Sequence, residues 1–257
     1  MKNRGFEYGV ISKCGLVKQV NQDRILINIG EKQLSEFGMF VIADGMGGHD
    51  WGEVASTIAI SELEKWWNDT LINIIKESDN MWTSIKNSLL TEFNYINYIV
   101  TNYKHRNIKM GTTLTVMFIY GDKYIIAHIG DSRIYIRENN KLKQLTKDHT
   151  ASFRKTRSST LNDSSINANN KLTQCIGINN IINPYVKVNN ITRNNMFLLC
   201  SDGLYNYINN KHLENIFITI KRNTKLQEIV TKIYDIVKKN GAGDNVSIIV
   251  LRYNKSF

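Results

Sequence analysis

The chain has 257 residues, of which 42% are hydrophobic and 10% aromatic, and its single Pro and 16 Gly argue against a low-complexity or collagen-like chain. Its formal net charge is +10, but the 33 Lys and Arg are scattered rather than gathered into basic runs, so we expect no nucleic-acid-binding surface. No stretch approaches the ~20 apolar residues of a membrane span, so we expect no membrane protein.

The N-terminal half predicts one buried strand and two helices. Val41–Ala43 is a short apolar run that ends at Asp-Gly, which is typical of a strand that enters a tight loop. Apolar residues then recur at helical spacing from Glu53 to about Trp67, and again over roughly 80–104. At this spacing both stripes predict helices that face a core rather than a ligand.

The C-terminal half predicts mainly strands. Thr112–Tyr120 and Lys123–Ile129 are rich in β-branched and aromatic residues, and Gly121-Asp122 between them predicts a hairpin. The remaining expected elements are strands at Arg133–Arg137, Met196–Cys200 and Asn245–Tyr253, and a helix that includes Leu226–Val237.

The order of these elements predicts the fold class. Strands and helices do not alternate regularly, which favours an antiparallel α+β arrangement with helices outside packed sheets over a parallel doubly wound sheet. Residues 150–170 are polar and are flanked by strand patterns, so we expect a flap rather than a linker between domains. We therefore expect one domain over residues 1–257.

Four aspartates share one setting, a turn with a neighbouring glycine next to a predicted strand. They are Asp44, Asp131, Asp202 and Asp244. A single Asp-Gly is more often a local turn, but four carboxylates in one cleft would repel one another and have raised pKa values. Hard divalent cations remove that cost, and oxygen ligands without a His or Cys set favour Mg²⁺ or Mn²⁺ over zinc.

A pair of such cations can clamp a phosphate and activate a bridging water for direct attack on phosphorus. No protein nucleophile is then required. The sequence agrees with this, because none of the three cysteines has an Arg six positions later, as a cysteine-phosphate mechanism would need; those positions hold Val20, Ile181 and Asn206.

At these residues the chain resembles a known family, the metal-dependent PPM protein phosphatases of the 2C type, in their bacterial form. The matching motifs occur in family order and extend almost from end to end. They are Val17–Asp23, Val41–His49, Gly111–Thr113, Ile129–Arg133, Leu145–His149, Leu172–Gly177, Leu199–Leu204 and Gly243–Ser247.

The resemblance implies a role for each site residue. Asp44 would bridge two metal ions, the carbonyl group of Gly45 would bind the second, and Asp202 and Asp244 would complete the first. Asp131, with Asp202, resembles the ligands of a third and weaker metal ion in bacterial members. These roles imply two Mn²⁺ or Mg²⁺ ions per chain and room for a third.

Two further residues take roles beside the metal ions. Asp23 would orient metal-bound water. Lys18 stands where the family often has an Arg that holds the substrate phosphate, and Lys keeps the charge but loses the two-pronged geometry of Arg.

The resemblance also implies a central antiparallel β-sandwich flanked by helix pairs, in four αββα layers. The implied activity is hydrolysis of phosphoserine and phosphothreonine in proteins, with phosphorylated proteins and a cognate Ser/Thr kinase as partners and a monomeric chain. The substitution at Lys18 leaves one alternative, a catalytically weak or inactive phosphoprotein-binding module of the same fold. A metal-dependent nuclease is a third reading, which the scattered charge disfavours.

Other polar residues near these motifs have ordinary structural explanations. We expect His49 to be a loop residue, His128 a paired sheet position, and His149 a structural hydrogen-bonding group. Arg133 is expected to pair with a carboxylate and steady Asp131. Thr112 and Thr113 fit either a strand start or polar groups near the cleft.

The cysteines indicate the cellular compartment of the protein. Cys14, Cys175 and Cys200 are dispersed and have no CxxC spacing, which is typical of reduced thiols in a cytosolic protein. The first residues, Met1 to Cys14, contain no apolar core long enough for a signal peptide. We therefore expect a soluble, cytoplasmic protein.

Overall fold

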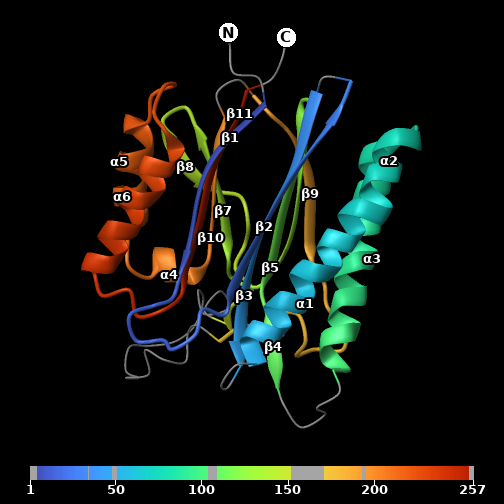
Figure 1. The fold of residues 1–257 in the computed structure, drawn as a ribbon, viewed down its shortest axis with the longest axis horizontal. Helices are drawn as coiled ribbons and strands as arrows, with labels where there is room; N and C mark the ends of the chain where they lie inside the picture. Colours follow the sequence, from blue (N-terminus) through green and yellow to red (C-terminus); the bar gives the residue numbers. More distant parts are fainter. Residues whose placement is uncertain are drawn as a thin grey trace, which may run out of the picture.

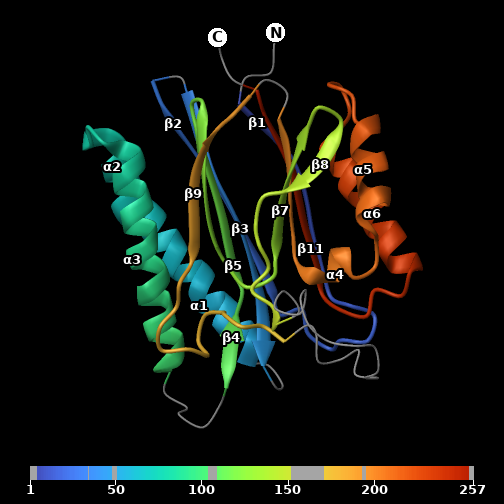
Figure 2. The ribbon, with the colours of Figure 1, turned by 180° about the vertical axis from the view of Figure 1, so that it is seen from behind.

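The computed structural model describes residues 5–33, 35–47, 51–103, 109–151, 171–192 and 195–254. The strands form two antiparallel sheets that pack face to face, and helices cover the outer face of each sheet (Figure 1). The same four layers of helix, sheet, sheet and helix are seen from behind in Figure 2. The expected α+β fold, a β-sandwich flanked by helices, is therefore confirmed.

The first sheet has the strand order β1-β11-β10-β7-β8. Its strands are β1 (Gly5–Lys13), β7 (Arg133–Glu138), β8 (Lys141–Gln144), β10 (Met196–Cys200) and β11 (Val246–Asn254). β1 and β11 pair from Gly5 opposite Asn254 to Lys13 opposite Val246. β11 thus lies in the interior of the sheet, although it follows the other four strands along the chain.

The second sheet has the order β2-β3-β5-β6-β9, and a short strand β4 pairs with the end of β3. Its strands are β2 (Asp23–Lys32), β3 (Ser35–Gly47), β4 (Met110–Thr112), β5 (Leu114–Tyr120), β6 (Lys123–Ile129) and β9 (Tyr185–Asn190). In the β2–β3 pair, Asp23 lies opposite Asp44. The predicted hairpin between β5 and β6 is present, with Tyr120 opposite Lys123.

Two groups of helices form the outer layers. On the second sheet, α1 (Trp51–Trp66) continues through a π-helical turn, η1 (Trp67–Leu71), into α2 (Ile72–Glu77), and α3 (Met81–Thr101) packs beside it. On the first sheet lie α5 (Asn210–Thr219) and α6 (Leu226–Lys239), and a short α4 (Asp202–Tyr205) follows β10. None of the helices in the described residues has the length and apolar content needed to cross a membrane.

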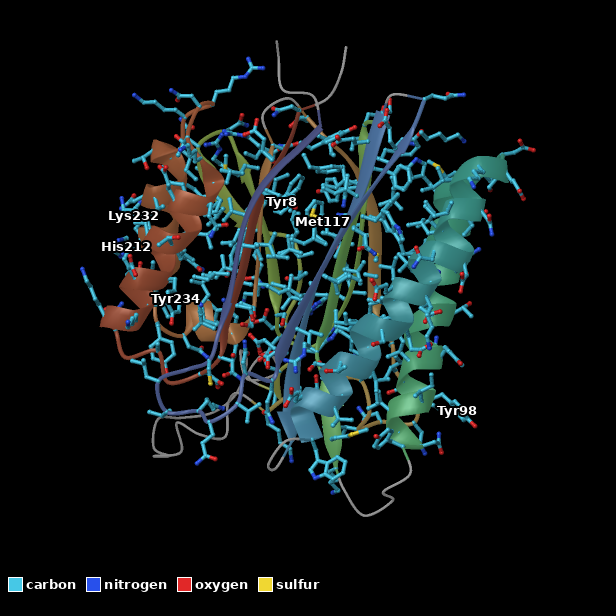
Figure 3. The ribbon with its side chains drawn as sticks, in the orientation of Figure 1. Tyr8, Tyr98, Met117, His212, Lys232 and Tyr234 are labelled. Carbon is cyan, nitrogen blue, oxygen red and sulfur yellow. The ribbon has the colours of Figure 1, made fainter. Side chains whose placement is uncertain are left out.

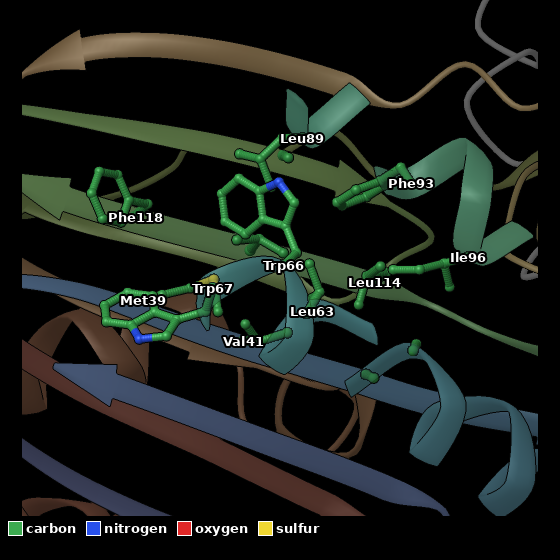
Figure 4. Packing of buried hydrophobic residues seen from close by; sticks show 14 of the residues in the cluster. Met39, Val41, Leu63, Trp66, Trp67, Leu89, Phe93, Ile96, Leu114 and Phe118 are labelled. Carbon is green, nitrogen blue, oxygen red and sulfur yellow. The ribbon is translucent and has the colours of Figure 1, made fainter. Parts of the chain in front are cut away.

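Each interface between layers has its own apolar core. Figure 4 shows Trp66, Leu89 and Phe93, which lie between the helices and the second sheet. Met117, labelled in Figure 3, belongs to the core between the two sheets. Each buried side chain of this size contributes about 1.5–3 kcal/mol, so these cores fix the relative positions of the strands that carry the polar residues described below.

Strand β3 shows why its sequence is a continuous apolar run. Met39 and Val41 pack toward the helices, whereas Phe40 and Ile42 pack toward the other sheet. Alternate residues of a strand point to opposite faces, so a strand buried on both faces is apolar throughout.

The structure corrects one sequence expectation. Asp44 was expected in a turn after a strand that ends at Ala43, but β3 continues to Gly47 because its last residues pair with β4. Strands β1, β2, β8 and β9 and helices α2 and α5 were not anticipated. The proposed flap lies almost wholly outside the described residues, which omit 152–170, and so does His49.

Candidate metal centre

One end of the layer between the sheets is polar. Along β3, Phe40 and Ile42 face the other sheet, and the alternation brings Asp44 to the same face two residues later. Asp23 takes the matching position on β2, two residues before Ile25. Strand pairing thus sets two carboxylates next to each other where the apolar core stops.

Asp23 is held by hydroxyl groups of the opposite sheet. Its side chain is only 2% exposed, and its Oδ2 atom accepts a hydrogen bond of 2.8 Å from Ser201 Oγ. Ser201 Oγ in turn accepts the backbone N–H of Ser247 at 3.0 Å. Within the described part of the chain, the buried Oδ1 atom of Asp23 has no hydrogen-bond partner.

Asp202 and Asp244 approach from the first sheet. Asp202 is the first residue of α4, directly after β10, and Asp244 lies two residues before β11. The two segments are in close contact, because a Cβ atom on Gly203 would lie 1.9 Å from the carbonyl oxygen of Asn245. Glycine at position 203 therefore lets the two aspartates lie on neighbouring backbones.

Asp131 lies in the turn between β6 and β7. Its backbone carbonyl accepts a hydrogen bond of 3.1 Å from the hydroxyl of Tyr205. The next residue, Ser132, is hydrogen-bonded to Thr113 with 2.8 Å between the two hydroxyl oxygens, and Thr113 Oγ1 also accepts the backbone N–H of Asp44 at 2.9 Å. Thr113 thus ties the Asp131 turn to β3, so it is both a residue between strands and a polar group beside the aspartates.

The close approach of these carboxylates has an electrostatic cost. Burial raises the pKa of Asp44 well above its usual range, and the charges of the other four aspartates raise it further. Burial also raises the pKa of Asp202 to about 7 and those of Asp23 and Asp131 to about 6. This mutual repulsion is what the four-carboxylate hypothesis predicted.

Lys18 forms an ion pair with one of these aspartates. Its Nζ atom lies 2.9 Å from Oδ1 of Asp244. The hydrogen bond to Asp244 raises the pKa of Lys18, and the charges of Asp44 and Asp202 act in the same direction. The residue expected to bind phosphate therefore lies beside the aspartates and is paired with one of them.

The chemistry of this site fits divalent cations. Its donors are carboxylate oxygens, and the orphaned Oδ1 atom of Asp23 adds a buried acceptor that a cation-bound water could satisfy. In the described residues, no three His, Cys, Asp or Glu side chains are already gathered as tightly as metal ligands are. Because these carboxylates repel one another, they come within metal-ligand distances only around a cation. Asp244 is in addition paired with Lys18.

Gly45 is placed beside this group by backbone contacts. It pairs with Thr112 of β4, and its N–H donates to the carbonyl of Gln22 at 3.3 Å. A Cβ atom at this position would lie 2.1 Å from the carbonyl oxygen of Gly52 in α1. No side chain can therefore stand at residue 45 without moving the start of α1.

A second charged group next to Asp131 is fully paired. Arg133 donates to both carboxylate oxygens of Asp148, with 2.6 Å from Nη2 to Oδ2, and its guanidinium carbon lies 3.4 Å from the centre of the Tyr205 ring. Gln144 also donates to Asp148, at 2.8 Å. The expected pairing of Arg133 with a carboxylate is confirmed. We call these four residues the Arg133 cluster.

The two histidines expected to be structural occupy structural positions. His128 is fully buried in β6, and its Nδ1 atom lies 2.9 Å from Thr115 Oγ1. His149 Nδ1 accepts the backbone N–H of Gly130 at 3.1 Å. Burial lowers the pKa of His128 to about 3, so this ring is neutral at pH 7.

Several hydroxyl residues of this site were not assigned a role in the sequence analysis. Ser201 donates to Asp23, the backbone N–H of Ser247 donates to Ser201, and Tyr205 contacts the Asp131 turn. A signal was available in the alternation of the strands. Residues 197 and 199 of β10 and 249 and 251 of β11 face the other sheet, so Ser201 and Ser247 follow on the same face as Asp44.

Comparison with known proteins finds the same fold in bacterial phosphatases. The family model described as protein phosphatase 2C matches residues 15–246. Serine/threonine phosphatase stp of Listeria welshimeri is 29% identical over 220 residues, covering 83% of this chain and 84% of that protein. Protein phosphatase PhpP of Streptococcus pneumoniae is 28% identical over 252 residues, covering 97% and 98%.

Two solved structures extend the comparison. The serine/threonine phosphatase of S. agalactiae superposes with a TM-score of 0.82 at 26% identity, covering 97% of this chain and 100% of that one. The catalytic domain of the phosphatase PstP, solved with two manganese ions, has a TM-score of 0.74 at 23% identity, covering 96% and 97%. The second similarity concerns the fold alone.

Proposed function

Because the chain belongs to the protein phosphatase 2C family, we propose that it removes phosphate from phosphoserine and phosphothreonine side chains of proteins with the help of divalent cations. One observation carries the proposal. Asp44, which is partly exposed, lies opposite Asp23 in the β2–β3 pair, and the charges of Asp23, Asp131, Asp202 and Asp244, which come from both sheets, all raise its pKa. When bound there, two Mn²⁺ or Mg²⁺ ions supply a hydroxide for in-line attack on phosphorus.

The ligand assignment is the one that the family resemblance implies. Asp44 would serve both cations, the carbonyl of Gly45 would serve the second, and Asp202 and Asp244 would complete the first. Asp131, together with Asp202, would serve a third and weaker cation. Support comes from the electrostatic coupling of these side chains and from the absence of His and Cys donors in the set.

Asp23 has a different role in this proposal. Ser201 fixes one of its oxygens, and the other is a buried acceptor without a partner among the described residues. This second oxygen can accept a proton or a hydrogen bond from a water in the site, which orients that water toward the phosphate.

Two of the three cysteines, Cys175 and Cys200, do not supply a competing nucleophile. Cys175 and Cys200 are buried, and burial raises the pKa of each thiol to about 12, so neither forms a thiolate near neutral pH. Direct attack by water therefore requires no covalent intermediate with the protein.

Hydrolysis of a phosphothreonine peptide in the presence of Mn²⁺ tests the function. Wild type should release phosphate with Mn²⁺ and lose this activity in EDTA, whereas Asp44→Asn should be inactive with and without the metal. Asp235→Asn changes an exposed aspartate of α6 and is the matched control, which should keep full activity. Peptide binding without hydrolysis in any metal would instead support the binding-module alternative.

We extend the proposal to the substrates, the oligomeric state and the location of the enzyme. Its substrates are phosphorylated proteins, and we propose that a cognate Ser/Thr kinase modifies the same proteins. We also propose that the chain is one domain and acts as a monomer. The three cysteines form no disulfide, which supports a cytoplasmic location.

A further inference from the structure

Lys18 and Asp244 share a contact that bears on how cations enter the site. The Oδ1 atom of Asp244 accepts a hydrogen bond from the backbone N–H of Asn245 at 2.8 Å and lies 2.9 Å from the Lys18 ammonium. Asp244 Oδ1 is thus already paired with the positive charge of Lys18. A divalent cation at Asp244 and the ammonium in its present place would repel each other strongly.

The backbone around Lys18 keeps this residue next to Asp244. The Lys18 N–H donates to the carbonyl of Gly15 at 3.1 Å, which closes a turn. The turn is fastened to the segment before β11, because the Leu16 N–H donates to the Ala242 carbonyl at 2.8 Å and the Gly15 N–H to Asn245 Oδ1 at 3.2 Å. Lys18 and Asp244 therefore remain neighbours, whichever partner the ammonium has.

We propose that Lys18 is a tethered competitor of the divalent cation at Asp244, and that this competition sets the affinity of the metal site. The inference rests on the metal-binding role of Asp244 in the proposed function. Binding of the cation displaces the ammonium, which remains on its turn beside the aspartates and can then contact the anionic phosphate of the substrate.

This exchange couples the two ligands of the enzyme. A phosphate that draws the ammonium away from Asp244 raises the affinity for the cation, and by thermodynamic linkage the cation raises the affinity for phosphate to the same extent. The Lys18 and Asp244 side chains are 41% and 39% exposed, so water and salt screen their attraction. The effect should therefore be moderate, about five- to tenfold in metal affinity at low salt.

Titration calorimetry with Mn²⁺ tests the proposal without any measurement of activity. Lys18→Met removes the ammonium but keeps the length of the side chain, and it should bind Mn²⁺ about five- to tenfold more tightly than wild type. Lys18→Arg keeps the charge and should stay near wild type. Lys232→Met removes one exposed charge from the outer face of α6 (Figure 3) and controls for net charge.

A second measurement separates exchange from a general charge effect. In EDTA, Lys18→Met should melt at a lower temperature than wild type, because Asp244 has lost its cation, yet Mn²⁺ should stabilise the variant more. Equal or weaker Mn²⁺ binding by Lys18→Met, or an equal gain in affinity in Lys232→Met, would overturn the inference and leave the proposed function intact. A wild-type chain that binds no Mn²⁺ would overturn both.

Discussion

Two charged groups lie side by side at the end of the sandwich, and they balance their charges in opposite ways. In the Arg133 cluster, a guanidinium, a carboxylate, an amide and an aromatic ring satisfy one another. In the aspartate group, five carboxylates act on one another, Lys18 pairs with one of them, and burial raises the pKa of several of them. The charges of the Arg133 cluster are balanced within the chain, whereas the excess negative charge of the aspartate group favours binding of cations from solution.

The largest expected effect comes from a substitution at Asp44. Asp44→Asn should reduce kcat/KM by about a thousandfold, because removal of a ligand shared by two cations costs several kcal/mol in the transition state. In EDTA the same variant should melt at a higher temperature than wild type, since it removes one carboxylate from a group whose members repel one another. Phosphate-release kinetics and calorimetric melting check both effects, and a loss of both activity and stability would contradict this explanation.

The Arg133 cluster should lose stability when one of its charges is removed, unlike the aspartate group. Arg133→Met leaves Asp148 without its cation in a largely buried place, where the two side chains are 19% and 14% exposed. We expect a loss of about 2–4 kcal/mol in the free energy of unfolding, in EDTA and in Mn²⁺ alike. Urea denaturation measures this loss, and Lys225→Met, which breaks an exposed pair with Glu228, is the control expected to lose much less stability.

The pH dependence of stability should also distinguish the aspartate group from the Arg133 cluster. Asp23 and Asp202 have folded-state pKa values raised to about 6 and about 7, so between pH 4 and these values the folded chain binds more protons than the unfolded chain. The stability that these two groups contribute in EDTA should therefore be fully present below about pH 4 and be lost as pH rises through about 6 and about 7. Melting temperatures across this range check the trend.

Saturating Mn²⁺ is the control for the pH experiment. The bound cations hold the carboxylates in their charged form, so the decrease with pH should disappear or reverse when the metal is present. A melting temperature in EDTA that rises steadily from pH 5 to pH 8 would show that the aspartates are already compensated within the chain.

The smallest expected effect lies where the two groups touch. Tyr205→Phe removes the hydroxyl that donates to the Asp131 carbonyl but keeps the ring beneath Arg133. We expect a loss of about 1 kcal/mol in stability and weaker binding of the third cation, with the first two unaffected. Calorimetry with Mn²⁺ separates the weak site from the tight ones, and uniform weakening of all of them would argue against this local role.

The sequence predicted the fold class well because the residues that define it form long runs. The helices near Glu53–Trp67 and 80–104 were found with small shifts, since their apolar stripes pack against a sheet as their spacing implies. Strands β1 and β2 were missed. Their faces are only partly buried, so their apolar alternation is weak.

For the candidate site, the sequence identified which residues gather but not how they are held. The convergence of Asp44, Asp202 and Asp244 could be expected from their shared turn motifs and from the family resemblance. The contact of Lys18 with Asp244 could not, because it depends on the turn at Gly15 and its bonds to Ala242 and Asn245. Such contacts between distant segments leave no periodic trace in the sequence.

The position of β11 has a consequence for synthesis of the protein. This strand lies between β1 and β10 but is translated after both, so the first sheet has a gap until Val246–Asn254 has left the ribosome. Asp244 emerges just before it, whereas Asp44 is translated some two hundred residues earlier, a delay of roughly 10–40 s at bacterial elongation rates of about 5–20 residues per second. A growing chain thus cannot assemble the aspartate group, and hydrolytic activity should begin only once translation has passed this strand.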